Sequence, residues 1–334
     1  MRPKEVKQII NKAVEDPVNT PPIMLWGPPG VGKSSIVFQV TEERGIGFLD
    51  IRLAQRDPTD LCGIPVPEDG HAKWLQPAEL PRDGRGIMIL DELPSAPPLV
   101  QVSAYQLTFD GKIGEYELPE GWYIVCAGNR VQDRAVVHRM SSALNNRLIH
   151  IDFEANVQDW TEWALGVGLD PNIIAFIQWR GDDLLFKFNP ESEEKAFPSP
   201  RTWEFASQML KICPKSLLPE VLEGTIGKGA TAEFTGFLKV QTELPDLNEI
   251  FEGKDIVPKK MDLRYALISA LVSRAKNAKQ FNRLIEYSMA LPAEYSVMLV
   301  QLLASKNRGL VATSVNFKKW SRAHSEIAID KKMI

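Results

Sequence analysis

Five short apolar segments in the first half of the 334-residue chain alternate with longer segments of mixed character. Because each is bounded by polar or turn-forming residues, we expect five buried strands. Crossover segments between strands predict a parallel sheet with helices on both faces. The predicted strands are Ile23–Trp26, Phe48–Arg52, Ile87–Asp91, Trp122–Ala127 and Leu148–Phe153.

Beyond residue 153 the apolar positions follow a different period. They recur at intervals of three and four residues, which is the spacing of one face of a helix. The pattern predicts a mainly helical region over 154–334, interrupted at 181–200 and 244–260 by stretches rich in proline, glycine and charge. The clearest examples are Leu263, Leu267, Ala270 and Leu271, then Phe281, Leu284, Ile285 and Met289. Four tryptophans in this half are expected to pack in its core: Trp160, Trp163, Trp179 and Trp203.

The segment after the first predicted strand carries the strongest chemical signal. It matches G-x-x-x-x-G-K-[ST], the loop whose backbone N–H groups surround the phosphates of a nucleoside triphosphate. The preceding strand and the following segment without glycine or proline supply the strand and helix that this loop requires. We predict that ATP binds here and that the Ser34 hydroxyl ligates Mg²⁺. The predicted nucleotide-binding residues are Gly27, Pro28, Pro29, Gly30, Val31, Gly32, Lys33, Ser34 and Ser35.

Polar residues at the ends of the third and fourth predicted strands extend this site. Asp91 and Glu92 follow a buried apolar strand, so they are expected at the edge where ligands bind in parallel sheets. Asp91 would hold the Mg²⁺ shell, and Glu92 would polarise the attacking water. Asn129 is expected to lie beside them and to bond the γ-phosphate or that water. An acid directly after the aspartate favours a hydrolase over a passive nucleotide binder.

Two arginines outside the loop are candidates for contacts with the γ-phosphate. Arg147 precedes the fifth strand and is expected to reach a neighbouring subunit's site as an arginine finger, with Arg139 as the second choice. Arg201 opens a predicted helix in the second half and is a candidate for a γ-phosphate sensor on a lid.

Composition limits the classes of protein and the kinds of site that remain possible for this chain. A net charge of −4 and a pI near 5.8 argue against a dedicated nucleic-acid binder. No apolar run is long enough to span a bilayer, and there is no signal-peptide core, so we expect a cytosolic protein. Three scattered cysteines predict reduced, mostly buried thiols, and the four histidines have no metal-ligand spacing. The cysteines are Cys62, Cys126 and Cys213, and the histidines are His71, His138, His150 and His324.

Two insertions interrupt the alternating pattern. Residues 63–81, between the second and third strands, contain a Glu-Asp-Gly turn and are expected to form a small hairpin. Residues 108–121 contain Asp110-Gly111, the strongest short hairpin signal, just before the fourth strand.

With these motifs in this order, the chain resembles the AAA+ ATPases, and specifically the MoxR group. The resemblance covers roughly residues 5–215, and its most specific part is Asp91 through Leu107, which looks like the acidic strand end, Pro-Pro turn and helix of that group. Residues 63–80 resemble its helix-2 insert, and Ser199-Pro200-Arg201 its sensor-2 motif. Two positions depart from the pattern: Arg130 follows Asn129 where proline is common, and Leu148 follows Arg147 where phenylalanine is common.

The resemblance implies a P-loop NTPase fold, in which a five-stranded parallel αβα core is followed by an α-helical lid and extra helices. It implies the domains 1–155 (core), 156–245 (lid with sensor 2) and 246–334 (helical extension). It further implies a homo-oligomeric ring of six subunits that hydrolyses ATP, with each site completed by the neighbour's Arg147. Members of the group remodel protein complexes, often with a partner that carries a von Willebrand factor A domain.

Two other functions remain open at this stage. A nucleic-acid-directed AAA+ motor would need basic or aromatic residues on the insertions, where His71, Lys73, Trp74 and Lys112 are balanced by acids. A monomeric phosphate-loop kinase would leave Arg147, Arg201 and the helical second half without a role.

Overall fold

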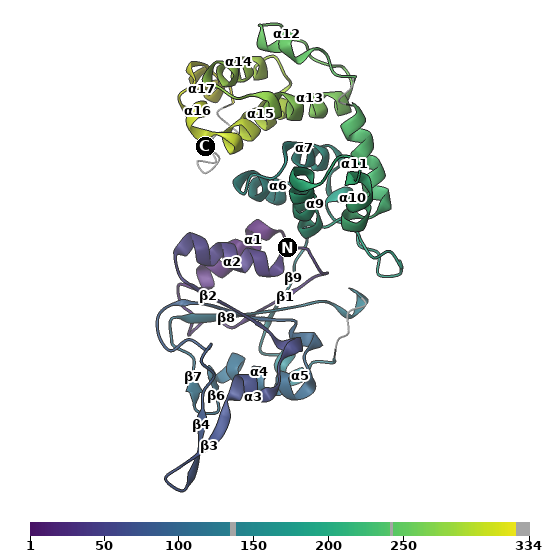
Figure 1. Cartoon of the computed structure of the whole chain (residues 1–334). Coiled ribbons are helices and arrows are strands. Elements are labelled where there is room, and N and C mark those ends of the chain that lie inside the picture. Colours follow the sequence, from purple (N-terminus) through teal and green to yellow (C-terminus); the bar gives the residue numbers. More distant parts are fainter. Residues whose placement is uncertain (134–137, 241–242, 325–334) are drawn as a thin grey trace. The chain divides into compact units, whose positions relative to one another are not determined.

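The computed structural model describes residues 1–133, 138–240 and 243–324 (Figure 1). The chain divides into two compact units. The first comprises Met1–Ala155 and Asn189–Glu191, and the second comprises Asn156–Phe188 and Ser192–Ile334.

A five-stranded parallel sheet forms the centre of the first unit. Its strands lie in the order β2-β5-β8-β1-β9, so every neighbouring pair is parallel and non-consecutive in the chain. This confirms the predicted α/β fold class, and each strand lies within a residue or so of its predicted position. The bounds are β1 Ile23–Trp26, β2 Gly47–Arg52, β5 Gly86–Asp91, β8 Trp122–Gly128 and β9 Ile149–Asp152.

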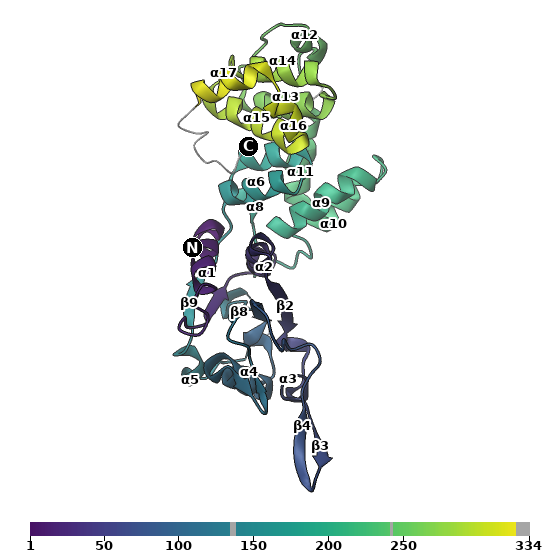
Figure 2. The ribbon, with the colours of Figure 1, turned by 90° about the vertical axis from the view of Figure 1, so that its left-hand side faces the viewer.

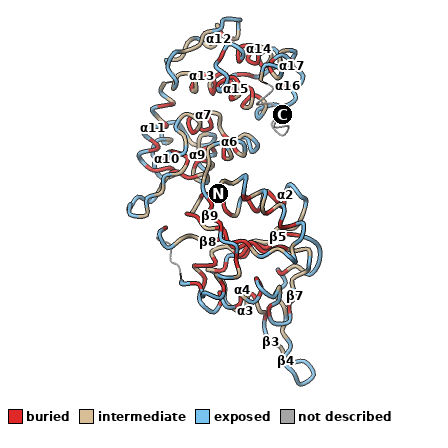
Figure 3. The backbone as a smooth tube through the Cα atoms, turned by 180° about the vertical axis from the view of Figure 1, so that it is seen from behind, coloured by how far each residue is buried: buried red, intermediate tan, exposed pale blue. Residues whose placement is uncertain are grey.

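Helices cover both faces of this sheet, as parallel crossovers require (Figure 1). One face carries α1 (Pro3–Ala13) and α2 (Lys33–Arg44), whose apolar positions such as Ile10 and Val37 are fully buried. The other face carries α3 (Pro58–Cys62), α4 (Pro98–Asp110) and α5 (Ser142–Asn145). Burial is concentrated in the strands and in the helix sides that face them (Figure 3). Three single turns of 3-10 helix complete the unit: η1 Leu53–Gln55, η2 Leu93–Ser95 and η3 Val131–Asp133.

Both insertions contain hairpins, but only one was predicted with the correct turn. The first pairs β3 (Ile64–Glu68) with β4 (His71–Leu75) through Asp69 and Gly70, both at positive φ, and projects away from the sheet (Figure 2). In the second, the turn between β6 (Lys112–Ile113) and β7 (Tyr116–Glu117) is at Gly114, not at Asp110-Gly111.

Asp110 and Gly111 instead end α4. Gly111 has φ 64° and its N–H donates to the Leu107 carbonyl, which is a helix C-terminus closed by a left-handed glycine. The error has a simple physical origin, because an Asp-Gly pair provides the same left-handed backbone to a hairpin turn and to a helix end.

All the regular elements that the structure describes in the second unit are helices, as the sequence predicts. Phe176 lies at the centre of an aromatic cluster with Trp203, Phe234, Phe237 and Trp179, at ring-centroid distances of 5.2 to 6.1 Å. Trp160 and Trp163 contact each other, so each of the four tryptophans packs against another ring. Trp160 and Trp203 are buried in the core as expected, whereas Trp163 and Trp179 are only half-buried. The helices are α6 Val157–Gly166, α7 Pro171–Arg180, α8 Asp182–Leu185, α9 Pro200–Ile212, α10 Leu218–Ile226, α11 Lys228–Val240, α12 Leu247–Phe251, α13 Met261–Arg274, α14 Ala278–Ser288, α15 Ala293–Lys306, α16 Arg308–Ala312 and α17 Val315–Ala323.

The cysteines are all unpaired, as predicted, but only Cys126 is buried, whereas Cys62 and Cys213 are half-buried. Burial raises the pKa of the Cys126 thiol to about 12. None of the described helices is long and apolar enough to cross a membrane.

Candidate nucleoside triphosphate site

Strand order brings the predicted site residues together at the carboxyl edge of the sheet. β8 lies between β5, which leads to Asp91 and Glu92, and β1, which leads to the glycine-rich loop. Asn129 follows β8 directly, so it lies between the acidic pair and the loop. Three segments that are far apart in the sequence therefore meet at one edge of the sheet, which is where ligands bind in open parallel sheets.

Glycine is required by the local geometry at two positions of the loop. Gly32 precedes α2 with φ 108°, a conformation that side chains other than glycine rarely adopt. A Cβ at Gly27 would lie 2.8 Å from the carbonyl oxygen of Phe153, so the loop begins in close contact with the chain beyond β9. The first turn of α2 has no acidic side chain, and no side chain caps its N-terminus, so the positive end of the helix dipole is available to phosphate oxygens.

Lys33 connects the loop to the neighbouring strand end. Its side chain is only 8% exposed, and its Nζ donates hydrogen bonds to the carbonyl oxygens of Gly27 (2.6 Å) and Pro28 (3.1 Å). The same Nζ donates to Oδ1 of Asn129 at 3.0 Å. The ammonium group is thus held inside the loop, at the position from which it can bind phosphate oxygens.

Ser34 and Asp91 form the second link across this edge. The Ser34 hydroxyl donates to Oδ2 of Asp91 at 2.6 Å, while Oδ1 of Asp91 accepts from the Glu92 N–H at 2.8 Å. A hydroxyl and a carboxylate side by side suit Mg²⁺, which usually takes one or two protein oxygens and completes its shell with phosphate oxygens and waters. The two residues therefore fit the predicted magnesium site. Among the described residues, no group of three or more His, Cys, Asp or Glu side chains could hold a metal without such a nucleotide.

Glu92 has an unusual backbone. Its φ of 58° and ψ of 28° lie in the left-handed region, which costs a non-glycine residue of order 1 kcal/mol or more. The turn that follows is held by close packing: a Cβ at Gly128 would lie 2.3 Å from Cδ of Pro94. The orientation of Glu92 is therefore set by a turn that β8 supports directly.

Two charged residues near this edge were not among the predicted site residues. Arg130 lies next to Asn129, and its guanidinium pairs with Asp133 at 3.4 Å and with Asp152 at 3.8 Å, which connects the ends of β8 and β9. Asp50 lies on β2 beside the acidic strand; burial and then the negative charge of Asp91 raise the pKa of its carboxyl. The sequence signal for Asp50 was its charge, because it is an acidic residue inside an otherwise apolar predicted strand.

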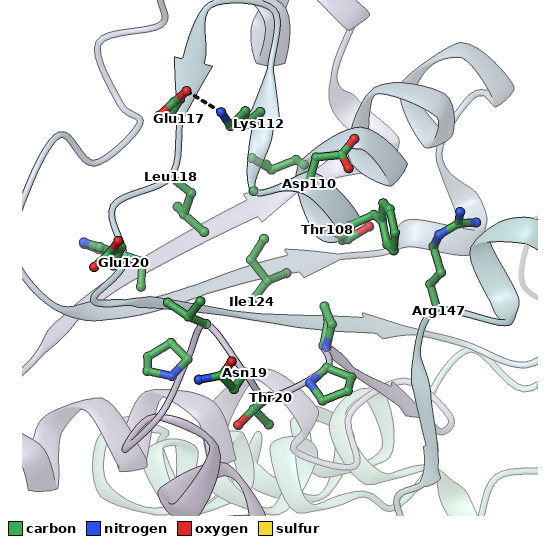
Figure 4. A pocket seen from close by; sticks show the side chains of 18 of the residues that line it. Asn19, Thr20, Thr108, Asp110, Lys112, Glu117, Leu118, Glu120, Ile124 and Arg147 are labelled. Atoms are coloured by element: carbon green, nitrogen blue, oxygen red, sulfur yellow. Dashed lines mark hydrogen bonds and ion pairs between the residues drawn. The ribbon is translucent and has the colours of Figure 1, made fainter.

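Arg147 lies at the opposite edge of the sheet. Arg147 comes just before β9, whose first residue, Ile149, pairs with Ile23, the first residue of β1. The phosphate loop begins four residues after Ile23, at the other end of β1. At the usual rise per strand residue, these two ends of β1 are about 13 Å apart. A cavity of about 720 Å³ occupies this edge, between residues 17–22, the end of α4 and the β6–β7 hairpin. Arg147 stands at its rim (Figure 4). The structure thus separates Arg147 from the loop of its own subunit.

The two other candidate arginines, Arg201 and Arg139, are exposed. Arg201 is the second residue of α9 in the second unit, after Ser199, whose hydroxyl accepts from the Thr202 N–H. Arg139 lies between η3 and α5, with no secondary structure of its own.

His150 has a structural role that the sequence did not indicate. Trp26, which ends β1 just before the loop, donates from Nε1 to Nδ1 of His150 at 2.8 Å. Because an indole can only donate, Nδ1 must be the bare nitrogen, and Nε2 then carries the proton toward the Asn145 carbonyl at 2.8 Å. One imidazole therefore links the strand before the loop to α5, the helix before Arg147.

Comparisons with known proteins identify similar proteins without placing the chain in a family. No family model matches the chain. Midasin from Giardia intestinalis is 39% identical over 74 residues, which make up 22% of this chain but only 2% of that protein.

Three of the similar solved structures have low sequence identity to this chain and TM-scores of 0.38 to 0.41. The RuvB Holliday junction branch migration motor of Thermotoga maritima is 16% identical with a TM-score of 0.40, covering 80% of each chain. NtrX from Brucella abortus in complex with ADP is 15% identical with a TM-score of 0.41, covering 99% of this chain and 68% of its own. A putative ATPase from Cytophaga hutchinsonii is 15% identical with a TM-score of 0.38, covering 89% and 80%.

Proposed function

We propose that the protein is an ATP-hydrolysing AAA+ ring ATPase of the MoxR type. One observation carries the hydrolase part of the proposal. Two hydrogen bonds connect the phosphate loop to the acidic pair at the end of β5 and to the asparagine at the end of β8. They run from Ser34 to Asp91 at 2.6 Å and from Lys33 to Asn129 at 3.0 Å. Transfer of a phosphoryl group to water requires a lysine, a hydroxyl, a carboxylate pair and a polar amide around the γ-phosphate, and this edge of the sheet supplies all of them.

In this mechanism the loop amides and Lys33 bind the β- and γ-phosphates. Ser34 and Asp91 would hold Mg²⁺, which would neutralise part of the charge on the phosphates. Glu92 orients the attacking water and accepts its proton, and Asn129 fixes the water or the γ-phosphate. When ATP enters, Lys33 exchanges its present bonds to Gly27 and Pro28 for bonds to phosphate oxygens, so the loop already has the cation in place.

The position of Arg147 supports the proposed ring. Since about 13 Å of strand separates it from its own loop, its guanidinium would serve the site of the next subunit, as an arginine finger does in trans. Arg201 would report on the γ-phosphate from the helical second unit. The proposed domains are the core 1–155, the lid 156–245 and the extension 246–334, in a ring of six subunits.

Three substitutions test the site and the ring together. Lys33→Ala should abolish tight ATP binding, whereas Glu92→Gln should keep binding and stop turnover, as measured by fluorescent-nucleotide titration and phosphate release. Arg147→Ala should bind ATP normally but lose about 10³-fold in kcat. Mixing Arg147→Ala with Glu92→Gln should restore activity, because intact sites then face intact fingers.

A mixture that stays inactive while both variants still form rings would refute the assignment of Arg147. Full activity of a protein that sedimentation shows to be monomeric with and without ATP would refute the ring. Arg139→Ala removes the second candidate for the finger from the same connection between β8 and β9, and it should leave kcat near the parent value if Arg147 is the finger.

The biological role we propose is remodelling of a protein complex, with a partner that carries a von Willebrand factor A domain. The support is the resemblance of Asp91 through Leu107 and of residues 63–80 to the MoxR group. The Glu92→Gln protein loaded with ATP should hold its substrate, so mass spectrometry of what co-purifies with it tests the role. Recovery of no such partner under these conditions, in a cell that encodes one, would count against it.

A further inference from the structure

The guanidinium of Arg147 lies on two aromatic rings of its own subunit. Its central carbon is 4.1 Å from the centroid of the Phe109 ring and 4.8 Å from that of Tyr105. The two rings are themselves stacked, with centroids 6.4 Å apart and planes inclined by 16°. Both come from the last turns of α4, one turn apart, so together they form a continuous π surface under the arginine.

This contact orients the arginine without neutralising it. Stacking uses the face of the guanidinium, whereas its five N–H donors lie in its plane. Within the described parts of the chain, its one hydrogen bond is from Nη1 to the Ala143 carbonyl at 3.1 Å, and no carboxylate pairs with it. A carboxylate partner would cancel the charge that a phosphoryl group must meet, while an aromatic ring leaves that charge available.

The two rings and Arg147 lie where a neighbouring subunit could contact them. Phe109 is 56% exposed, and Arg147 is half-buried at the rim of the cavity at the amino edge of the sheet. Figure 4 shows the arginine beside the end of α4, where Thr108 and Asp110 lie.

We propose that Phe109 and Tyr105 are positioning residues that hold Arg147 in the orientation in which it enters the active site of the neighbouring subunit. The inference rests on the proposed role of Arg147 as a finger in trans. Neither ring touches the nucleotide; each acts only through the guanidinium. The ligand of this assembled group is the γ-phosphate of the nucleoside triphosphate bound to the next subunit.

Substitution by leucine tests the π surface, because leucine keeps apolar bulk and removes the ring. For Phe109→Leu or Tyr105→Leu we expect kcat for ATP to fall about fivefold, and for the double variant about thirtyfold. ATP affinity and ring assembly should stay within about twofold of the parent values. Phe109→Trp should keep full activity, since indole is the better partner for a cation.

Val102→Ala is the matched control. Val102 is 65% exposed on the same helix and has no aromatic ring, so its truncation should leave kcat within about twofold. A loss in this variant as large as that of Phe109→Leu would show that α4 needs apolar surface in general and would overturn the specific role of the rings.

Mixed rings distinguish a finger defect from a damaged site. Phe109→Leu subunits have intact sites, so mixing them with Glu92→Gln subunits should raise activity above either alone, whereas mixing with Arg147→Ala should not. Failure of the first mixture, or normal kcat in the double variant while Arg147→Ala is inactive, overturns the positioning role alone. Normal activity of Arg147→Ala would instead refute the assignment of Arg147 as the finger, on which this inference rests, and leave the proposed ATPase activity standing.

Discussion

Gly128, the last residue of β8, has a role that depends on having no side chain. A Cβ at this position would lie 2.3 and 2.5 Å from Cδ and Cγ of Pro94 and 3.0 Å from Cε of Met24. Pro94 belongs to the turn after Glu92, so even a methyl group would push that turn away from the strand. The glycine thereby couples the Asn129 strand end to the Glu92 turn.

We expect Gly128→Ala to reduce turnover more than binding. Overpacking by one methyl group costs about 1–3 kcal/mol, which the Glu92 turn absorbs by moving. The kcat for ATP should fall about tenfold or more, while nucleotide affinity changes about threefold at most. Steady-state kinetics and nucleotide titration measure both quantities.

Gly236→Ala is the control for this substitution, since a Cβ there has open space and lies within α11. Alanine favours a helix over glycine, so this variant should be as stable as the parent or slightly more so. Equal loss of kcat and affinity in Gly128→Ala would contradict a specific effect on the turn.

At the scale of elements, β9 and α5 are joined to β1 through one imidazole. Trp26 donates to His150, and His150 reaches the Asn145 carbonyl at the end of α5. The planes of the Trp26 and His150 rings are inclined by only 19°, with centroids 6.0 Å apart, which suits an in-plane hydrogen bond between two ring nitrogens. Because Gly27 follows Trp26 and Arg147 follows α5, the same bridge connects the start of the loop to the base of the finger.

We expect His150→Ala to lower the free energy of unfolding of the first unit by about 1 kcal/mol, because it leaves the Trp26 N–H and the Asn145 carbonyl without this partner. Urea unfolding followed by tryptophan fluorescence measures the change. His71→Ala, an exposed histidine on β4, should stay within about 0.5 kcal/mol. Identical stability of the two variants would show that the bridge contributes nothing.

At the scale of the whole molecule, charge bears on the choice between a protein remodeller and a nucleic-acid motor. The two hairpins carry lysines that are already paired: Lys73 lies 2.6 Å from Glu68, and Lys112 lies 2.6 Å from Glu117. With a net charge of −4, the chain has no basic excess with which to attract a polyanion.

DNA or RNA should therefore change the ATPase rate less than about twofold, at salt concentrations from about 50 to 200 mM. The measurement is phosphate release with single-stranded and duplex DNA and with RNA. Strong stimulation that falls steeply with salt would instead support the motor.

The sequence by itself determined the strands, the helical second half, the phosphate loop and the acidic pair. These are local signals: apolar runs, helical period and a glycine spacing that only phosphate binding explains. It also predicted both hairpins, yet it placed one turn at Asp110-Gly111, because the same dipeptide ends a helix and turns a hairpin.

Only the tertiary structure decided which distant residues meet. Because β8 lies between β5 and β1, Asn129 comes within hydrogen-bond distance of Lys33. Because of the register of β9 against β1, Arg147 lies at the amino-terminal edge of the sheet, where its guanidinium contacts the rings of Phe109 and Tyr105. Strand order, register and stacking depend on contacts between segments separated by tens of residues. No local pattern encodes those contacts, because they arise only when the whole core packs.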